Sequence, residues 1–276
     1  MPELPEVEVI CRGLRPHLIG QMITQVFYNQ KSLRKPVDIV NIRKEVILQT
    51  IVAVERRAKY ILIHMNSGAV LIIHLGMTGN LGIFSKHTPL AKHDHLQWLL
   101  GDENQLRYHD IRRFGSIHIL SPVEAKEREK TFFTTSGPEP FDDRFSPDYL
   151  YNLSKGKSLT IKQCIMDSKI VVGIGNIYAN ESLFRAGISP EKKISSLTKP
   201  QWQHLIATIR KVLDHAIDCG GSTISDFVNA SQQQGYFQMN FTVYGKDGQP
   251  CPHCCAPLLK SKLGGRATFY CKHCQK

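Results

Sequence analysis

The order of apolar and polar residues divides the chain into a strand-rich part followed by a helix-rich part. Between residues 22 and 120, β-branched and other apolar residues form short runs, among them residues 46–54, 60–65 and 69–75. The sequence Asn66-Ser67-Gly68 separates the last two runs and is typical of a hairpin connection. Because no helix-length pattern interrupts these runs, the sequence predicts an antiparallel β-sandwich or barrel.

Helical patterns flank this strand-rich region. At the N-terminus, Pro5 and a stripe of apolar residues at helical spacing predict a first helix. A long apolar stripe over residues 202–217 predicts another helix, and a shorter one is expected to begin at Gly175-Asn176. Residues 131–148 are rich in Ser, Gly, Pro and Asp, which is typical of a linker.

These patterns together predict an α+β multidomain chain. We expect a β-sandwich domain with an N-terminal helix over residues 1–130 and the linker over 131–148. A helical domain is expected over 149–241 and a separate C-terminal segment over 242–276.

Four cysteines in the C-terminal segment form two Cys-x-x-Cys pairs: Cys251, Cys254, Cys271 and Cys274. Each pair is typical of a tight turn that presents two thiolates, and a β-hairpin between the pairs would complete a tetrahedral site for Zn²⁺. Since four thiolates leave no open coordination position, the sequence predicts one structural zinc ion. An iron–sulfur cluster and four unrelated structural cysteines are the alternatives. The hairpin strands are expected over residues 258–263 and 267–270, with Gly264-Gly265-Arg266 at the tip.

The charge of the chain favours a polyanionic partner. Lysine and arginine total 35 against 24 acidic residues, which gives a net charge of +11. Nucleic acid and an anionic membrane surface both fit such a charge. No run reaches the roughly 18 apolar residues that a membrane-spanning helix needs, and the acidic N-terminus is unlike a signal peptide. We therefore expect a cytoplasmic protein without membrane contact, and the acid-free segment from Cys251 onward favours nucleic acid.

The N-terminus carries a candidate nucleophile. Removal of Met1 would expose the secondary amine of Pro2. An α-amino group has a pKa near 7.7 to 8.0, so about a tenth of it is neutral at pH 7, and such an amine can form a Schiff base with a sugar carbon. Glu3 lies next to it and would shuttle protons. The alternative is that this segment only begins a helix.

Seven motifs, spread from the first residue to the last, resemble bacterial formamidopyrimidine-DNA glycosylases. They are MPELPEVE at the start, RAKY at 57–60, HLGM at 74–77, KHDH at 92–95, RRFG at 112–115, GIGNIY at 173–178 and the cysteine pairs.

The resemblance implies a bifunctional DNA glycosylase and abasic-site lyase of base-excision repair. Its substrates would be oxidised purines in double-stranded DNA, namely 8-oxoguanine and formamidopyrimidines. Pro2 would attack C1′ and form the Schiff base, Glu3 would act as acid and base, and Glu6 would support them. Lys59 would transfer a proton in β-elimination, and Arg266 would act in δ-elimination. The protein would be a monomer with a helix–two-turns–helix domain and a zinc-ribbon finger.

The resemblance also assigns residues that contact DNA. An enzyme that acts on a base must flip it out of the duplex and fill the gap. Met77, Arg112 and Phe114 would be inserted for this purpose. Further DNA contacts are expected from His74, His93 and Asn176. The polar segment 221–236 would close over the flipped base.

Two positions depart from the family pattern, and two other functions stay open. Ile111 stands where proline is common, and Cys255 where glycine is common. One alternative function is that of the sister family acting on oxidised pyrimidines, which typically begins Pro-Glu-Gly-Pro. The other is a zinc-ribbon protein that binds DNA without chemistry.

Overall fold

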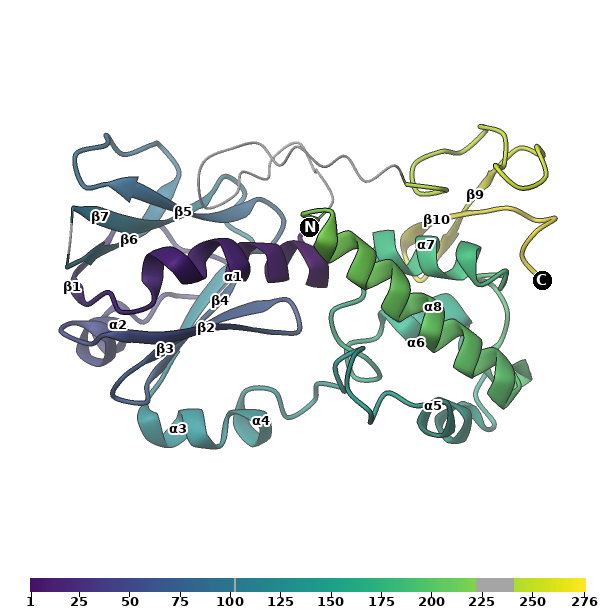
Figure 1. Cartoon of the computed structure of the whole chain (residues 1–276), viewed down its shortest axis with the longest axis horizontal. Coiled ribbons are helices and arrows are strands. Elements are labelled where there is room, and N and C mark those ends of the chain that lie inside the picture. The colour runs from purple at the N-terminus through teal and green to yellow at the C-terminus, as the bar shows by residue number, and fades with distance from the viewer. Residues whose placement is uncertain (102, 222–240) are drawn as a thin grey trace. The chain divides into compact units, whose positions relative to one another are not determined.

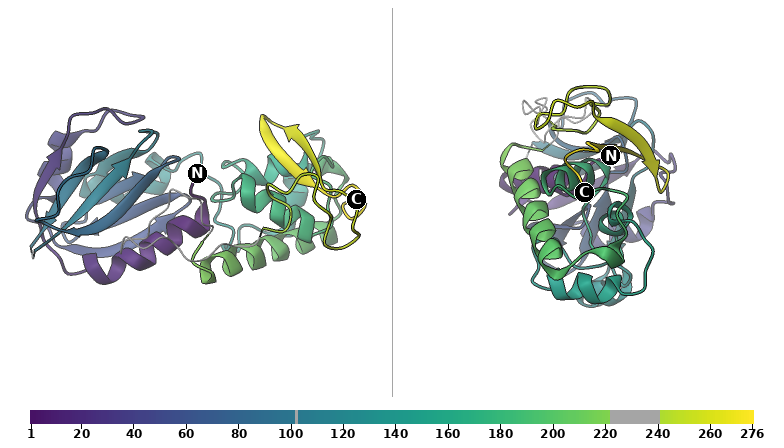
Figure 2. Two further views of the ribbon diagram at one scale, coloured as in Figure 1. Left: turned by 90° about the horizontal axis from the view of Figure 1, so that it is seen from above. Right: turned by 90° about the vertical axis from the view of Figure 1, so that its right-hand side faces the viewer.

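The computed structural model describes residues 1–101, 103–221 and 241–276 (Figures 1 and 2). The described chain forms two compact units. The first holds residues 1–134 and 219–221, and the second holds residues 135–218 and 241–276. None of the helices in the described ranges is long and apolar enough to cross a membrane.

The first unit is built on two four-stranded antiparallel sheets. One sheet has the order β2-β3-β4-β8 and the other the order β1-β6-β7-β5. The strands of the first sheet are β2 (Ile51–Arg57), β3 (Tyr60–Met65), β4 (Val70–His74) and β8 (Ser116–Leu120). Those of the second are β1 (Ile23–Tyr28), β5 (Gly79–Ser85), β6 (Asp94–Leu100) and β7 (Asn104–Asp110). One buried core contains residues of both sheets, so the predicted β-sandwich is confirmed.

Helix α1 (Leu4–Leu18) supplies the third element of this core (Figure 1). Its apolar stripe, which includes Val7, Leu14 and Leu18, is fully buried and belongs to the same cluster as the strands. The helix begins where the sequence predicted, since the Glu6 carboxylate accepts a hydrogen bond from the Glu3 N–H at 2.8 Å. This bond satisfies one of the N–H groups that a helix leaves without a partner at its start.

The expectation that no helix interrupts the strand-rich region is wrong. Helix α2 (Ile39–Val46) lies between β1 and β2, and the apolar run 46–54 therefore begins as the end of a helix. Asp38 caps α2, because its carboxylate accepts a hydrogen bond from the N–H of Asn41 at 3.1 Å. In so short a segment, apolar residues fit a helix and a strand equally well, and the cap decides between them. Two further short helices, α3 (Pro122–Lys126) and α4 (Arg128–Thr131), follow β8.

The second unit contains four α-helices among its described residues, and a hairpin. The helices are α5 (Pro147–Ser154), α6 (Ile161–Met166), α7 (Asn176–Arg185) and α8 (Lys199–Asp218), with a short 3₁₀ turn, η1 (Ile194–Ser196), before α8. The apolar stripe predicted between residues 202 and 217 is the buried face of α8, and α7 begins at Asn176 as expected. Strands β9 (Leu259–Leu263) and β10 (Arg266–Tyr270) pair in antiparallel fashion to form the hairpin.

Candidate active site and metal centre

The start of α1 gathers the groups predicted to perform the chemistry. Pro2 is buried, and Glu3 and Glu6 expose only 3% and 1% of their surface. A helix N-terminus carries a partial positive charge that favours carboxylates. A polar cluster therefore lies at the start of α1. It consists of the two carboxylates and the N-terminal amine.

The α-amino group is surrounded by charges of both signs. Burial holds the pKa of the Met1 amine below its usual range, Glu3 and Glu6 oppose this effect, and Lys59 and Arg112 reinforce it. These interactions place the amine, Lys59 and Arg112 in one neighbourhood, although they come from the N-terminus and from two separate loops. A lowered pKa increases the fraction of neutral, nucleophilic amine at pH 7.

Lys59 lies in the turn between β2 and β3, close to His74. The ring of Tyr60 lies opposite His74 in the strand pairing, with ring centroids 4.9 Å apart. Burial, followed by the positive charges of Lys59 and Arg34, lowers the pKa of His74 to about 4. His74 is therefore neutral at pH 7, and its Nδ1 accepts a hydrogen bond from the Gly76 N–H at 3.1 Å. The imidazole thereby orients the turn that carries Met77.

The three predicted wedge residues lie on two loops that touch each other. Met77 lies in the turn between β4 and β5, and Arg112 and Phe114 lie in the loop between β7 and β8. Met77 is 40% exposed and Phe114 44%, which is unusual for large apolar side chains. The Arg112 guanidinium lies over the Phe114 ring at 4.7 Å from its centroid. Both apolar side chains are thus placed where another molecule can contact them.

His93 lies on the loop that precedes β6. Its ring packs edge to face against His109, with centroids 5.8 Å apart. The backbone carbonyl of His93 accepts a hydrogen bond from the N–H of Asp110 at 3.1 Å. This loop is therefore joined to the end of β7.

The second unit holds Asn176 and Arg266. Asn176 is the first residue of α7, and Gly175 stands at its N-cap without a side-chain cap. A helix N-terminus preceded by glycine is a favourable position for an anion such as phosphate. Arg266 is exposed and begins β10, where it pairs with Leu263. It therefore belongs to the strand, whereas the sequence predicted it at the tip of the hairpin.

Two side chains connect the hairpin to the helices, a role that the sequence predicted for neither; for Lys162 it indicated an exposed lysine or a phosphate contact. Lys162 of α6 is 1% exposed, and its ammonium donates to the carbonyl of Ala267 at 2.7 Å. Asn180 of α7 accepts a hydrogen bond from the Phe269 N–H at 2.8 Å. Nothing in the local sequence distinguishes these residues from solvent-exposed ones, because their partners are 105 and 89 positions away.

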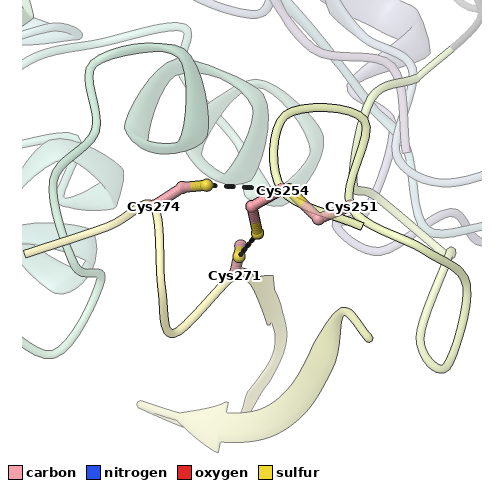
Figure 3. A group of neighbouring side chains, drawn as sticks. All are labelled: Cys251, Cys254, Cys271 and Cys274. Atoms are coloured by element: carbon pink, nitrogen blue, oxygen red, sulfur yellow. Dashed lines mark hydrogen bonds between the residues drawn. The ribbon is translucent and has the colours of Figure 1, made fainter. Parts of the chain in front are cut away.

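The four predicted metal ligands converge at the base of the hairpin (Figure 3). All four sulfur atoms lie within 4.8 Å of one another. The Sγ atoms of Cys251 and Cys274 are 3.8 Å apart, and those of Cys254 and Cys271 are 3.5 Å apart. In a tetrahedral site with Zn–S bonds of about 2.3 Å, the sulfur atoms are about 3.8 Å apart. The cluster therefore fits a single tetrahedral metal ion.

The knuckle geometry explains one departure from the family pattern. Cys255 adopts a φ of +61°, in the left-handed region where side chains are unfavourable. Its N–H donates to the carbonyl of Cys251 at 2.9 Å, which closes the first knuckle. Glycine suits this position for that reason.

This combination of a β-sandwich with a helix at its N-terminal amine, a helical unit and a four-cysteine hairpin matches known proteins over its whole length. A family model described as the formamidopyrimidine-DNA glycosylase N-terminal domain matches residues 1–117, and one described as the H2TH domain of the same enzyme matches residues 136–228. The chain belongs to the formamidopyrimidine-DNA glycosylase family, as the sequence motifs predicted.

Individual relatives agree with this result. Formamidopyrimidine-DNA glycosylases of Magnetococcus marinus and Geotalea uraniireducens are 42% and 45% identical, each over 100% of both chains. A variant of the Lactococcus lactis enzyme, solved with DNA containing Fapy-dG, superimposes with a TM-score of 0.90 at 33% identity, over 100% of both chains. The same enzyme with abasic-site DNA gives a TM-score of 0.89 at 32% identity, over 99% of each chain.

Proposed function

We propose that this chain excises oxidised purines, namely 8-oxoguanine and formamidopyrimidines, from double-stranded DNA and then cleaves the strand at the abasic site. DNA glycosylase activity in base-excision repair follows from the family. The observation that supports the finer proposal is the start of α1, where the buried Pro2 precedes the buried carboxylates Glu3 and Glu6, and where the amine of Met1 lies within electrostatic reach of both carboxylates and of Lys59.

In the first step the neutral amine of Pro2 attacks C1′ of the damaged nucleotide after Met1 has been removed. The nitrogen–carbon bond forms, the glycosidic bond breaks, and the bonding electrons leave with the base, which takes up a proton. Glu3 is placed to move protons to and from the sugar during ring opening. The amine gives up its proton, the C1′–O4′ bond breaks, and the ring oxygen takes up a proton. The product is an iminium ion between Pro2 and the opened sugar, and its nitrogen carries no proton because Pro2 is a secondary amine.

The second step breaks the DNA strand. Lys59 removes a proton from C2′, and the electrons expel the 3′ phosphate by β-elimination. Removal of the C4′ proton from the resulting unsaturated iminium ion then provides the electrons that expel the 5′ phosphate from C5′ by δ-elimination, in which Arg266 participates. Water then releases Pro2 from the sugar fragment.

DNA must be opened before this chemistry starts. Extrusion of a nucleotide costs a few kcal/mol of lost stacking and pairing. Met77, Arg112 and Phe114 fill the gap and offset this cost, while His74, His93 and Asn176 contact the DNA as well. The segment proposed to close over the flipped base, residues 221–236, lies outside the described residues except for Gly221.

The metal ion of the cysteine cluster is proposed to be Zn²⁺. Four thiolates with tetrahedral spacing hold zinc in structural sites, where the ion stabilises the local fold. In this chain Cys251, Cys254, Cys271 and Cys274 would thereby fix the hairpin that carries Arg266. We further propose a monomer that acts on DNA in the bacterial cytoplasm.

Trapping of the Schiff base tests the proposed function. The chain is incubated with a duplex carrying 8-oxoguanine opposite cytosine in the presence of borohydride, and the adduct is digested and mapped by mass spectrometry. We expect an adduct on a peptide that begins at Pro2, and none with an undamaged duplex. A duplex with an oxidised pyrimidine is included because the Lactococcus lactis enzyme has been solved with such DNA. Trapping with that duplex alone would select the pyrimidine alternative, and tight binding without any adduct would contradict an enzymatic role.

A further inference from the structure

A single buried carboxylate connects the two loops that carry the wedge residues. Asp110 is the last residue of β7 and is fully buried. One of its oxygens, Oδ1, accepts hydrogen bonds from the Thr78 hydroxyl at 2.6 Å and the Arg112 N–H at 3.2 Å. The other, Oδ2, accepts from the Gly115 N–H at 2.9 Å and the Tyr108 hydroxyl at 3.2 Å. Four donors from two loops and one strand thus share one negative charge.

The Thr78 hydroxyl completes a small ring of hydrogen bonds. It donates to Asp110 and accepts a hydrogen bond from the Arg112 N–H at 3.0 Å. Thr78 is the residue after Met77, and Arg112 and Gly115 enclose Phe114. Arg112 therefore bonds the Asp110 carboxylate through its own N–H. Met77 and Phe114 each precede a residue that bonds this carboxylate, Thr78 through its hydroxyl and Gly115 through its N–H.

Close packing of the backbones supports the same connection. A Cβ atom on Gly76 would lie 2.4 Å from the carbonyl carbon of Phe114. A Cβ atom on Gly115 would lie 1.8 Å from the Tyr108 hydroxyl and 2.6 Å from the carbonyl oxygen of His74. Real Cβ atoms do not approach other atoms this closely, so both positions require glycine. The two loops are in direct contact and cannot move independently without breaking the bonds to Asp110.

We propose that Asp110 is a positioning residue that holds the Met77 turn and the Arg112–Phe114 loop as one rigid body, so that the three side chains enter DNA together. This inference rests on the proposed wedge role of these residues. Preorganisation matters here because a loose loop would have to be ordered at the moment of insertion, which costs conformational entropy.

The variant Asp110→Asn tests the proposal with little change in size. An amide has one acceptor oxygen, while its nitrogen only donates. The hydroxyls of Thr78 and Tyr108 can reverse their roles, but the N–H groups of Arg112 and Gly115 cannot. In either orientation of the amide, one of these two N–H groups faces another donor. Whichever way the amide turns, one of these N–H groups loses its bond to residue 110: either Gly115 loses its acceptor there, or Arg112 keeps only its bond to the Thr78 hydroxyl.

The experiment compares two reactions of the full chain. The first is single-turnover excision of 8-oxoguanine from a duplex, which needs base extrusion. The second is borohydride trapping on a single-stranded abasic oligonucleotide, in which no base has to be extruded or replaced. We expect Asp110→Asn to slow the first by about 10- to 100-fold. Trapping on the single strand is expected to stay within about twofold of wild type, which a general loss of folding would not allow.

Four further variants complete the test, one of them the single variant Phe114→Ala. Thr78→Val removes one donor and is expected to slow duplex excision less than Asp110→Asn does. Glu103→Gln makes the same carboxylate-to-amide change on an exposed residue before β7 and is expected to have no effect. The double variant Asp110→Asn with Phe114→Ala is expected to be no slower than the slower single variant, because both act through insertion.

The outcomes distinguish a failure of the proposed positioning role of Asp110 from a failure of the proposed function. The positioning role would be overturned if Asp110→Asn excised 8-oxoguanine at the wild-type rate or lost excision and single-strand trapping equally. It would also be overturned if the effects of Asp110→Asn and Phe114→Ala on the excision rate were fully additive. If the wild-type chain is not trapped, or if Phe114→Ala excises normally by itself, the proposed function or its wedge fails instead.

Discussion

The ammonium group of Lys162 in α6 donates a hydrogen bond of 2.8 Å to the hydroxyl of Thr268 in β10, in a place where the lysine is almost entirely buried. The same nitrogen donates to the carbonyl of Ala267. A buried lysine is costly unless its donors are satisfied, so this contact holds a strand of the hairpin firmly against a helix. The strand begins with Arg266, and the position of that arginine therefore depends on Lys162.

Replacement of Lys162 by methionine should weaken the attachment of the hairpin. The change keeps the length of the side chain and removes its donors, leaving the acceptors of residues 267 and 268 without this partner. We expect a loss of about 2 kcal/mol in the free energy of unfolding, measured by thermal or urea denaturation. Lys157→Met, at an exposed position in the same unit, serves as the control and should change stability by less than about 0.5 kcal/mol.

Blocking the N-terminal amine should abolish trapping without changing the fold. A chain extended by two residues before Pro2 places an amide nitrogen where the proposed nucleophile would be. We expect no borohydride adduct with 8-oxoguanine duplex and an unchanged melting temperature, whereas the same extension at the C-terminus should preserve the adduct. Pro2→Gly replaces the secondary amine by a primary amine and should slow base release by at least about tenfold. An adduct of normal yield in the N-terminally extended chain would exclude the amine as nucleophile.

The stability of the chain should depend on pH through His74. Its pKa is about 4 in the folded chain and near 6.5 when unfolded, so the unfolded state binds the extra proton first as pH falls. The contribution of neutral His74 to the free energy of unfolding is fully present above pH 6.5. It decreases by about 3 kcal/mol in total as the pH falls to about 4. His74→Asn should flatten this part of the pH profile of unfolding, measured with denaturant between pH 7 and pH 4.5. His17→Asn, at an exposed site, should leave the slope as it is.

The metal site should respond differently to Cys254 and Cys255, although the two residues are neighbours. Cys254→Ser removes a ligand and is expected to release the metal and weaken DNA binding. Cys255→Gly should retain one metal ion per chain and raise stability by about 1 kcal/mol, because glycine adopts the left-handed backbone without strain. Elemental analysis measures the stoichiometry and identifies the metal. Equal metal content in both variants would contradict the four-cysteine assignment.

The sequence alone was sufficient for most of the elements whose pattern is local or closely spaced. The buried face of α8, the start of α7 and the two cysteine pairs follow from periodicity, caps and spacing within a few residues. Helix α2 was missed because its apolar residues also fit a strand, and only Asp38 marked its beginning. The motifs that identified the family are local in the same sense.

Only the tertiary structure decided which residues support the proposed site. Thr78 and Asp110 are 32 positions apart, and Lys162 and Thr268 are 106 positions apart, yet each pair shares a hydrogen bond. In the sequence, Asp110 and Lys162 look like ordinary charged residues of a strand and a helix. They become buried, satisfied and important for positioning only when packing brings distant donors and acceptors together, because the free energy of a buried polar group depends on its surroundings and not on its neighbours in the chain.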